Sequence, residues 1–225
     1  MIIDVFTLFP NIFKPFLQES IVGNAIKSNA LKINLIDIRN FTDNKHGKVD
    51  DYPYGGGAGL VMSAQPIASA LEFMKADSRK LIYFTPQGKK LNQTKVAEYK
   101  NESRFGILCG HYKDIDQRIR DLYVTEELSV GDYVLSGGEL PALIMIDSIA
   151  RLIDGVIGDI ESARKDSFQN NLLGFPCYTR PADFKGIRVP EVLMSGNHKN
   201  IAEWHKKKSL ELTKEMRPDL LNEKK

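Results

Sequence analysis

The chain has 225 residues, 42% hydrophobic and 27% charged with a net charge of +2, a composition typical of a globular protein with one large domain or a large and a small one. No stretch approaches the roughly eighteen consecutive apolar residues of a membrane span, and the start lacks a signal-peptide pattern, so we expect a cytoplasmic protein without membrane contact. Only two cysteines occur and the four histidines form no H-E-x-x-H, which argues against a disulfide framework and a bound metal.

Apolar patterns predict an α/β fold. Strands are expected at residues 2–9, 31–38, 80–85 and 105–110, and helices at 11–30, 63–75 and 89–100 between them, with Ser63 as an N-cap. Alternation of this kind predicts a parallel sheet with helices on both faces.

The next segment, residues 129–155, combines flexible backbone with a rigid helix. Gly131, Gly137 and Gly138 precede an apolar helical pattern that has Pro141 in its first turn and Gly155 at its end. Neither this cluster nor the earlier "YGGGAG" at 54–59 has the spacing of a dinucleotide-binding loop or a P-loop. Each cluster can be read as a ligand loop or simply as tight turns.

A polar stretch without period follows and divides the chain. We predict a first domain at 1–158, a flexible linker at 159–168 and a small helical domain at 169–225, with helical pattern from 187 to 216. Residues 160–225 carry 13 Lys and Arg against 9 Asp and Glu, a balance of +4, whereas the remainder stands at −2. This basic end suits nucleic acid, although residues 205–217 equally fit a solvated helix face.

Three loops of the first domain share one chemistry. Residues 83–88, 108–114 and 130–138 offer glycine or proline, backbone amides, and aromatic or aliphatic side chains. In open α/β sheets such loops bind ligands beyond the carboxyl ends of the strands. We expect a cofactor pocket here that holds a planar, uncharged base through backbone groups.

Five segments then identify a family. The stretches "VDDYPYGGGAGLVM", "GDYVLSGGELPALIMIDSIARLI", "SARKDSF", "YTRP" and "VPEVLMSG" resemble, in order, the bacterial tRNA (guanine-N1)-methyltransferases that act at position 37. These are S-adenosylmethionine enzymes of the SPOUT class. The resemblance implies a deep trefoil knot in the first domain and a homodimer with the active site at the subunit interface.

The resemblance also implies roles for individual residues. It places the catalytic aspartate at Asp166 and its partner arginine at Arg151. It assigns cofactor binding to Tyr83, Pro86, Gly110, Val130, Gly131, Tyr133, Leu135, Gly137, Gly138 and Pro141. It assigns tRNA contacts to Asp50, Gly56, Arg180, Ser195, Gly196, His198 and the run Lys206–Lys208.

The reaction explains the two catalytic residues. Guanine N1 must lose its proton to become a nucleophile, and a carboxylate can accept that proton as a general base. An arginine can stabilise the negative charge that develops at O6. Structural alternatives are an N-cap role for Asp166 before a helix at Ser167, and a surface pair of Arg151 with Asp147.

Four positions depart from the family pattern. Lys113 and Asp114 stand where glutamate and glycine are usual, so Mg²⁺, to which the family's activity is linked, is doubtful here, although Asp114 or Asp116 could take the glutamate's place as ligand. Gly174 and Cys177 replace a frequent acidic residue and a histidine.

Two other functions compete with this one. A different SPOUT enzyme would methylate a ribose hydroxyl or ribosomal RNA, but a carboxylate suits the acidic guanine N–H better than an alcohol. A non-catalytic RNA-binding protein is disfavoured because Asp166, Arg151 and the Gly137–Gly138 pair are all intact.

Overall fold

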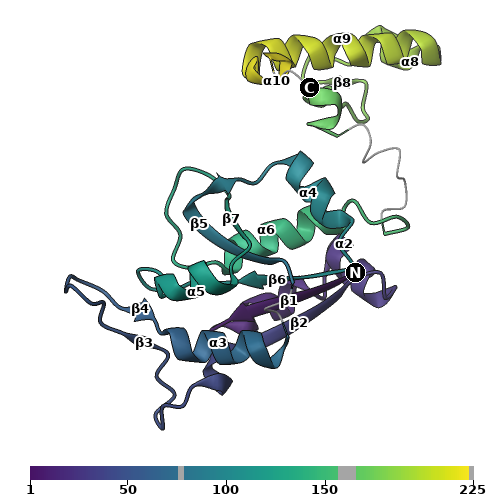
Figure 1. The fold of residues 1–225 in the computed structure, drawn as a ribbon. Helices are drawn as coiled ribbons and strands as arrows, with labels where there is room; N and C mark the ends of the chain where they lie inside the picture. The colour runs from purple at the N-terminus through teal and green to yellow at the C-terminus, as the bar shows by residue number, and fades with distance from the viewer. Residues whose placement is uncertain (76–78, 157–165, 223–225) are drawn as a thin grey trace. The chain divides into compact units, whose positions relative to one another are not determined.

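The computed structural model describes residues 1–75, 79–156 and 166–222 (Figure 1). The chain separates into two compact units, Met1–Gly158 and Asp159–Lys225, which we call the first and second unit. None of the helices described is both long and apolar enough to cross a membrane.

The first unit is built on a five-stranded parallel sheet, which confirms the predicted α/β class. Its strands are β1 (Ile2–Thr7), β2 (Lys32–Asp37), β5 (Leu81–Lys90), β6 (Arg104–Leu108) and β7 (Glu126–Ser129), in the order β2-β1-β6-β5-β7. In the centre, Ile3 lies opposite Ile33 on one side and Phe105 on the other. The mainly apolar sequences of β1 and β6 suit a sheet that is covered on both faces.

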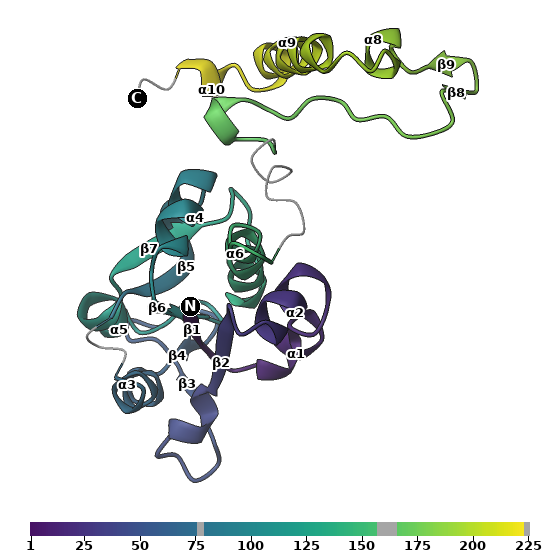
Figure 2. The ribbon, with the colours of Figure 1, turned by 90° about the vertical axis from the view of Figure 1, so that its right-hand side faces the viewer.

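Helices pack against both faces of this sheet (Figure 2). On one face Phe105 and Ile107 join a buried cluster with α2, α4 and α6, and on the other Phe6 and Leu108 join a second cluster with α3 and α5. The helices are α1 (Phe13–Phe16), α2 (Ser20–Lys27), α3 (Ala64–Phe73), α4 (Gln93–Lys100), α5 (Gln117–Tyr123) and α6 (Glu139–Ala150), with short 3₁₀ turns η1 (Pro10–Ile12) and η2 (Ile38–Phe41).

The helix predicted at 11–30 is wrong as a single element. It breaks between Phe16 and Ser20, whose φ of 54° is left-handed. A Cβ on Gly23 would lie 2.5 Å from the carbonyl oxygen of Gln18, so glycine lets the two parts approach closely.

The helix predicted at 89–100 begins later than expected. Lys89 and Lys90 prolong β5 and pair with β7, and Asn92 caps α4 by accepting a hydrogen bond from the Lys95 amide at 2.9 Å. Neither α5 nor β7 is predicted from the sequence, because both are short, polar segments without a clear apolar period.

A two-stranded hairpin, β3 (Asp50–Asp51) with β4 (Val61–Met62), carries the earlier glycine cluster. Gly55, Gly56, Gly57 and Gly59 all have φ between 79° and 110°, which residues with side chains rarely adopt. The reading of this cluster as tight turns therefore accounts for its glycines.

The second unit contains η3 (Gln169–Asn171), β8 (Asp183–Phe184), β9 (Ile187–Arg188), α8 (Glu191–Met194), α9 (His198–Met216) and α10 (Asp219–Asn222). The hydroxyl of buried Thr213 accepts the Leu173 amide at 2.9 Å, and Phe175 stacks on His205 with centroids 3.6 Å apart, so both contacts join the segment before β8 to α9. The predicted helical start at 187 is wrong, because Ile187 pairs with Phe184 in a hairpin. Residues 159–165 of the predicted linker lie outside the described residues, and Asp166–Phe168 form a bend and turn.

Candidate active site

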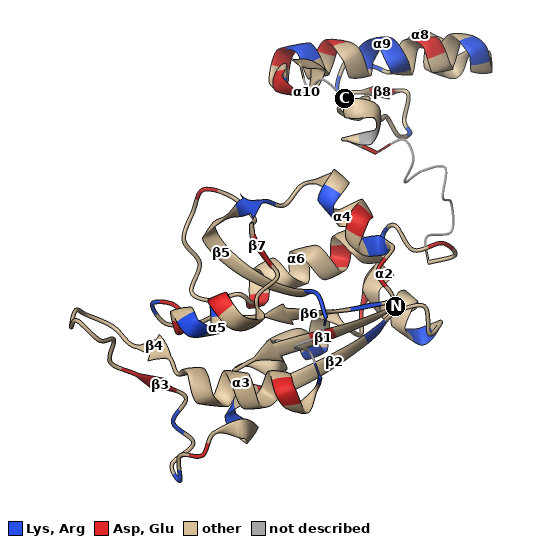
Figure 3. Ribbon diagram, viewed as in Figure 1, with Lys and Arg blue, Asp and Glu red and all other residues tan. Residues whose placement is uncertain are grey.

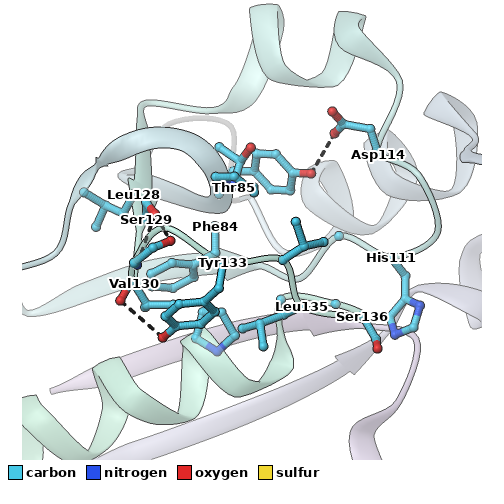
Figure 4. A pocket seen from close by; sticks show the side chains of 18 of the residues that line it. Phe84, Thr85, His111, Asp114, Leu128, Ser129, Val130, Tyr133, Leu135 and Ser136 are labelled. Atoms are coloured by element: carbon cyan, nitrogen blue, oxygen red, sulfur yellow. Dashed lines mark hydrogen bonds between the residues drawn. The ribbon is translucent and has the colours of Figure 1, made fainter.

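One pocket gathers the three loops that the sequence singles out. It lies beyond the ends of β6 and β7 and beside the middle of β5, and residues from 83–86, 110–114 and 128–141 line it (Figure 4). The prediction of 83–88 as a loop is wrong, because this segment is part of β5, whose pairing with β7 shifts register between Phe84 and Lys89. All ten residues for which the resemblance implies cofactor binding are in this lining. The fold therefore brings them together, while their binding role remains a prediction.

The glycines of this pocket are required by packing between the loops. A Cβ on Gly138 would lie 2.7 Å from the Cα of Cys109, and one on Gly137 would lie 2.4 Å from Cδ2 of His111. The Gly138 amide donates to the Gly110 carbonyl at 2.9 Å. The missing side chains of these two glycines therefore admit the neighbouring loop, while the close approach of their backbone to a ligand stays a prediction.

A polar network fixes the pocket wall from behind. The hydroxyl of Tyr83 donates to Asp114 at 2.7 Å (Figure 4), and the guanidinium of Arg120 lies 3.3 Å from the same carboxylate. Arg120 also donates to both carboxylate oxygens of Glu127, at 2.8 and 2.7 Å, and to Gln87 at 2.7 Å. Burial, followed by the hydrogen bond to Asp114, raises the pKa of Tyr83 well above its ordinary value. The Tyr83 hydroxyl thus remains a hydrogen-bond donor. Arg120 connects Gln87 of β5, Asp114 of the loop after β6 and Glu127 of β7.

The carboxylates of the second loop are occupied by cations. Asp114 is paired with Arg120. Asp116 accepts two hydrogen bonds from the guanidinium of Arg118, at 2.9 and 2.7 Å. Those bonds lower the pKa of Asp116. Among the residues described, no group of three His, Cys, Asp or Glu is arranged to hold a metal ion. Lys113 lines the pocket, but its ammonium lies 3.8 Å from where a Cβ would stand on Gly57 of the β3–β4 loop.

A buried carboxylate underlies the glycine loop. Glu139, the first residue of α6, is 3% exposed, and it accepts the hydroxyl of Thr7 at 2.8 Å. Its other oxygen lies 3.7 Å from Nε2 of His111 in the pocket wall. A negative charge at a helix N-terminus is favourable, and these partners tie β1 to two of the loops. Burial, with the charge of Glu139 adding to it, raises the pKa of the nearby Cys109 thiol.

The predicted catalytic pair lies on different units. Arg151 is the exposed C-cap of α6 in the first unit, and Asp166 is an exposed residue of the second. No helix begins at Ser167, so the alternative of Asp166 as an N-cap is wrong.

The residues predicted to contact tRNA are divided in the same way. Asp50 lies in β3 and exposed Gly56 in the following loop, both in the first unit. The second unit carries Arg180, Ser195, Gly196, His198 and Lys206–Lys208, of which Ser195 caps α8 and His198 begins α9. Figure 3 shows Lys and Arg positions at several places along the ribbon of α9.

Sequence reasoning missed Thr7, Arg120 and Glu139. Glu139 had a signal, since it is an acidic residue at the start of an otherwise apolar helix. Thr7 and Arg120 had no sequence signal. The partner of Thr7, Glu139, is distant in the sequence, and the partner of Arg120, Glu127, lies on β7, which was not predicted.

The sequence of the chain resembles known proteins over almost its whole length. The family described as tRNA (Guanine-1)-methyltransferase TrmD matches residues 1–223. A protein named tRNA (guanine-N(1)-)-methyltransferase from Clostridioides difficile is 51% identical over 220 residues, which are 96% of this chain and 95% of the relative. Proteins with the same name from Geobacillus kaustophilus and Caldanaerobacter subterraneus are 51% and 50% identical, covering 99% and 98% of this chain and 92% of each relative.

Proposed function

Because the chain belongs to the tRNA (guanine-N1)-methyltransferase family and is a tRNA-modifying methyltransferase, we propose that it carries a methyl group from S-adenosylmethionine to N1 of guanosine 37, beside the anticodon of bacterial tRNAs. In this proposal the first unit has the trefoil knot of the SPOUT class. The enzyme works in the cytoplasm as a homodimer whose interface contains the active site.

One observation carries the cofactor proposal. The ten residues expected to bind S-adenosylmethionine come from three segments that are separate in the sequence, within 83–86, at 110 and within 130–141, and line a single pocket. Its aromatic and aliphatic side chains suit the adenine ring, and its hydroxyls suit the ribose. When bound, the cofactor supplies an activated methyl group.

Asp166 is the proposed general base. Asp166 is an exposed residue, as contact with a base splayed out of an RNA loop requires. It would accept the N1 proton of guanine, leaving a nitrogen lone pair that attacks the methyl carbon.

Arg151 is the proposed stabiliser of charge. Loss of the N1 proton places negative charge on guanine O6, and a guanidinium can donate to that oxygen. Its place at the end of α6, which begins at the glycine loop, connects it rigidly to the cofactor pocket.

The proposed reaction does not use a metal ion at the second loop. Lys113 stands where the family pattern has glutamate, and Asp114 and Asp116 are held by Arg120 and Arg118. We expect methyl transfer to persist in EDTA when spermidine supports the tRNA fold. Activity that collapses in EDTA and returns with Mg²⁺ but not with spermidine would contradict this expectation.

The proposal is tested by methyl transfer from labelled S-adenosylmethionine to matched tRNA transcripts with G or A at position 37. We expect label only in the G37 transcript, recovered as N1-methylguanosine after nuclease digestion and mass spectrometry. Equal labelling of both transcripts, or label on a ribose, would support instead a different SPOUT enzyme. Binding of tRNA with no transfer at all would support the non-catalytic alternative.

A further inference from the structure

The β8–β9 hairpin of the second unit has no role in the site described so far. Phe184 lies opposite Ile187, and Asp183 opposite Arg188. The two residues between the strands, Lys185 and Gly186, have φ of 55° and 83°, as in a tight two-residue turn. Figure 2 shows the hairpin at one end of this unit, beside α8.

The hairpin exposes two large apolar side chains next to two cations. Phe184 is 63% and Ile187 74% exposed, and as a cross-strand pair they share one face. The ammonium of Lys185 lies 5.5 Å from the centre of the Phe184 ring, and the guanidinium of Arg188 is 81% exposed, 3.6 Å from Asp183. A single exposed apolar residue is ordinary and needs no explanation. Here two large apolar side chains lie side by side on strands of two residues each, which are too short to build a core of their own, so the pair is a candidate contact surface.

Aromatic and cationic side chains in this arrangement match single-stranded RNA. Unpaired bases stack on aromatic rings, and Lys and Arg neutralise the phosphates between them. A membrane surface would call for a wider apolar patch, and the basic excess of residues 160–225 favours a polyanion over an uncharged protein surface.

We propose that the β8–β9 hairpin is an RNA-contact element, in which Phe184 stacks on an unpaired base of the bound tRNA while Lys185 and Arg188 contact its phosphates. Ile187 extends the apolar face beside the ring. The choice of tRNA as the partner rests on the proposed function.

The test measures tRNA affinity of the full chain over a series of salt concentrations, with tRNA fluorescence anisotropy as readout. Phe184→Ala should weaken binding about 5- to 150-fold, and Phe184→Trp should restore it, because either aromatic ring can stack. Lys185→Gln with Arg188→Gln should flatten the slope of log affinity against log salt by about 1.4 to 1.8.

The controls are matched in exposure. Leu122→Ala removes an apolar side chain of α5 that is 74% exposed, and Lys27→Gln removes an exposed cation of α2; both should bind tRNA as the unmodified chain does. Calorimetric affinity for S-adenosylmethionine should be the same in every variant. Size-exclusion chromatography should show one oligomeric state throughout.

Two outcomes would overturn the hairpin proposal: tRNA affinity and salt slope unchanged in both hairpin variants, or a change in oligomeric state that accounts for the loss. Methyl transfer to the G37 transcript by the unmodified chain separates this failure from failure of the proposed function. If the unmodified chain methylates G37 but binding does not depend on the hairpin, only the hairpin proposal is rejected. If binding depends on the hairpin but the unmodified chain does not methylate G37, only the proposed reaction is rejected.

Discussion

The two units differ in what holds their functional residues in place. In the first unit, the pocket is continuous with the core: Tyr83 is 4% exposed, Cys109 is fully buried, and Gly138 packs directly on its backbone. In the second unit, the side chain of Phe184 is exposed, and so are the residues predicted to contact tRNA except Lys208, which is half-buried. Among its described residues, the buried ones are Ser209, Thr213 and Leu220.

This difference indicates two ways of making a binding surface. A small-molecule pocket needs side chains held within fractions of an ångström, which close packing provides. An RNA surface needs accessible charge and stacking area, which packing would remove. The two surfaces should therefore respond differently to mutation, stability being coupled to ligand binding only in the first unit.

The largest expected effect lies in the second unit and leaves stability unchanged. Asp166→Asn should reduce methyl transfer by roughly 10²- to 10⁴-fold, since a general base is lost, with cofactor affinity and thermal midpoint preserved. Single-turnover transfer to the G37 transcript measures the effect, and Asp121→Asn, an exposed carboxylate of α5, is the control. Turnover near that of the control would remove Asp166 from the base role.

A change of one hydroxyl in the pocket wall should affect stability. Tyr83→Phe should lower the free energy of unfolding by about 1–2 kcal/mol, because the buried hydroxyl donates to the carboxylate of Asp114. Tyr133→Phe is the matched control: its hydroxyl donates to the Val130 carbonyl at 3.3 Å from a ring 53% exposed, so we expect less than about 0.5 kcal/mol. Urea titrations of both variants give the comparison, and equal losses would contradict it.

The smallest effect uses the two cysteines, one in each unit. Cys109 is buried, and its raised pKa keeps it a thiol, whereas Cys177 is exposed. At pH 8 an aromatic disulfide reagent should therefore label one thiol rapidly in the folded chain and a second only in denaturant, because the thiolate is the reactive form. Rapid labelling of both thiols would show that the pocket loops open readily.

The sequence predicted the sheet because its central strands are mainly apolar runs, such as 2–9 and 105–110. It failed where tertiary contacts decide the local structure. Lys89 and Lys90 are polar residues beside a helical pattern, yet they pair with β7 and so extend β5. Ile187 has helical neighbours in the sequence, yet the turn at Lys185 and Gly186 places it in a hairpin.

The candidate pocket could be predicted because its three segments carry glycine or proline and two of them lie at or after predicted strands, although the structure places 83–86 within β5. The reason for those glycines could not, since the contact of Gly138 with Cys109 joins residues 29 positions apart in the sequence. The supporting groups Thr7 and Glu139 were hidden for the same reason, their bond spanning 132 positions.

The central claim is that a packed pocket on one chain works with an exposed base on another. We propose that Asp166 serves the pocket of its partner in a two-fold dimer, which gives two equivalent sites, each built from both chains. Gly138→Val should destroy the pocket, because even a Cβ there would lie 2.7 Å from backbone of Cys109, and Asp166→Ala removes the base. Each variant alone should be nearly inactive.

The decisive measurement is methyl transfer by a co-refolded mixture of these two variants, with mixed dimers verified by mass spectrometry. If the base acts in trans, each mixed dimer has one site with an intact pocket and an intact aspartate, so about a quarter of all sites should work at random mixing. A mixture that contains the mixed dimer and is as inactive as its parents would show that Asp166 does not act on the partner's pocket.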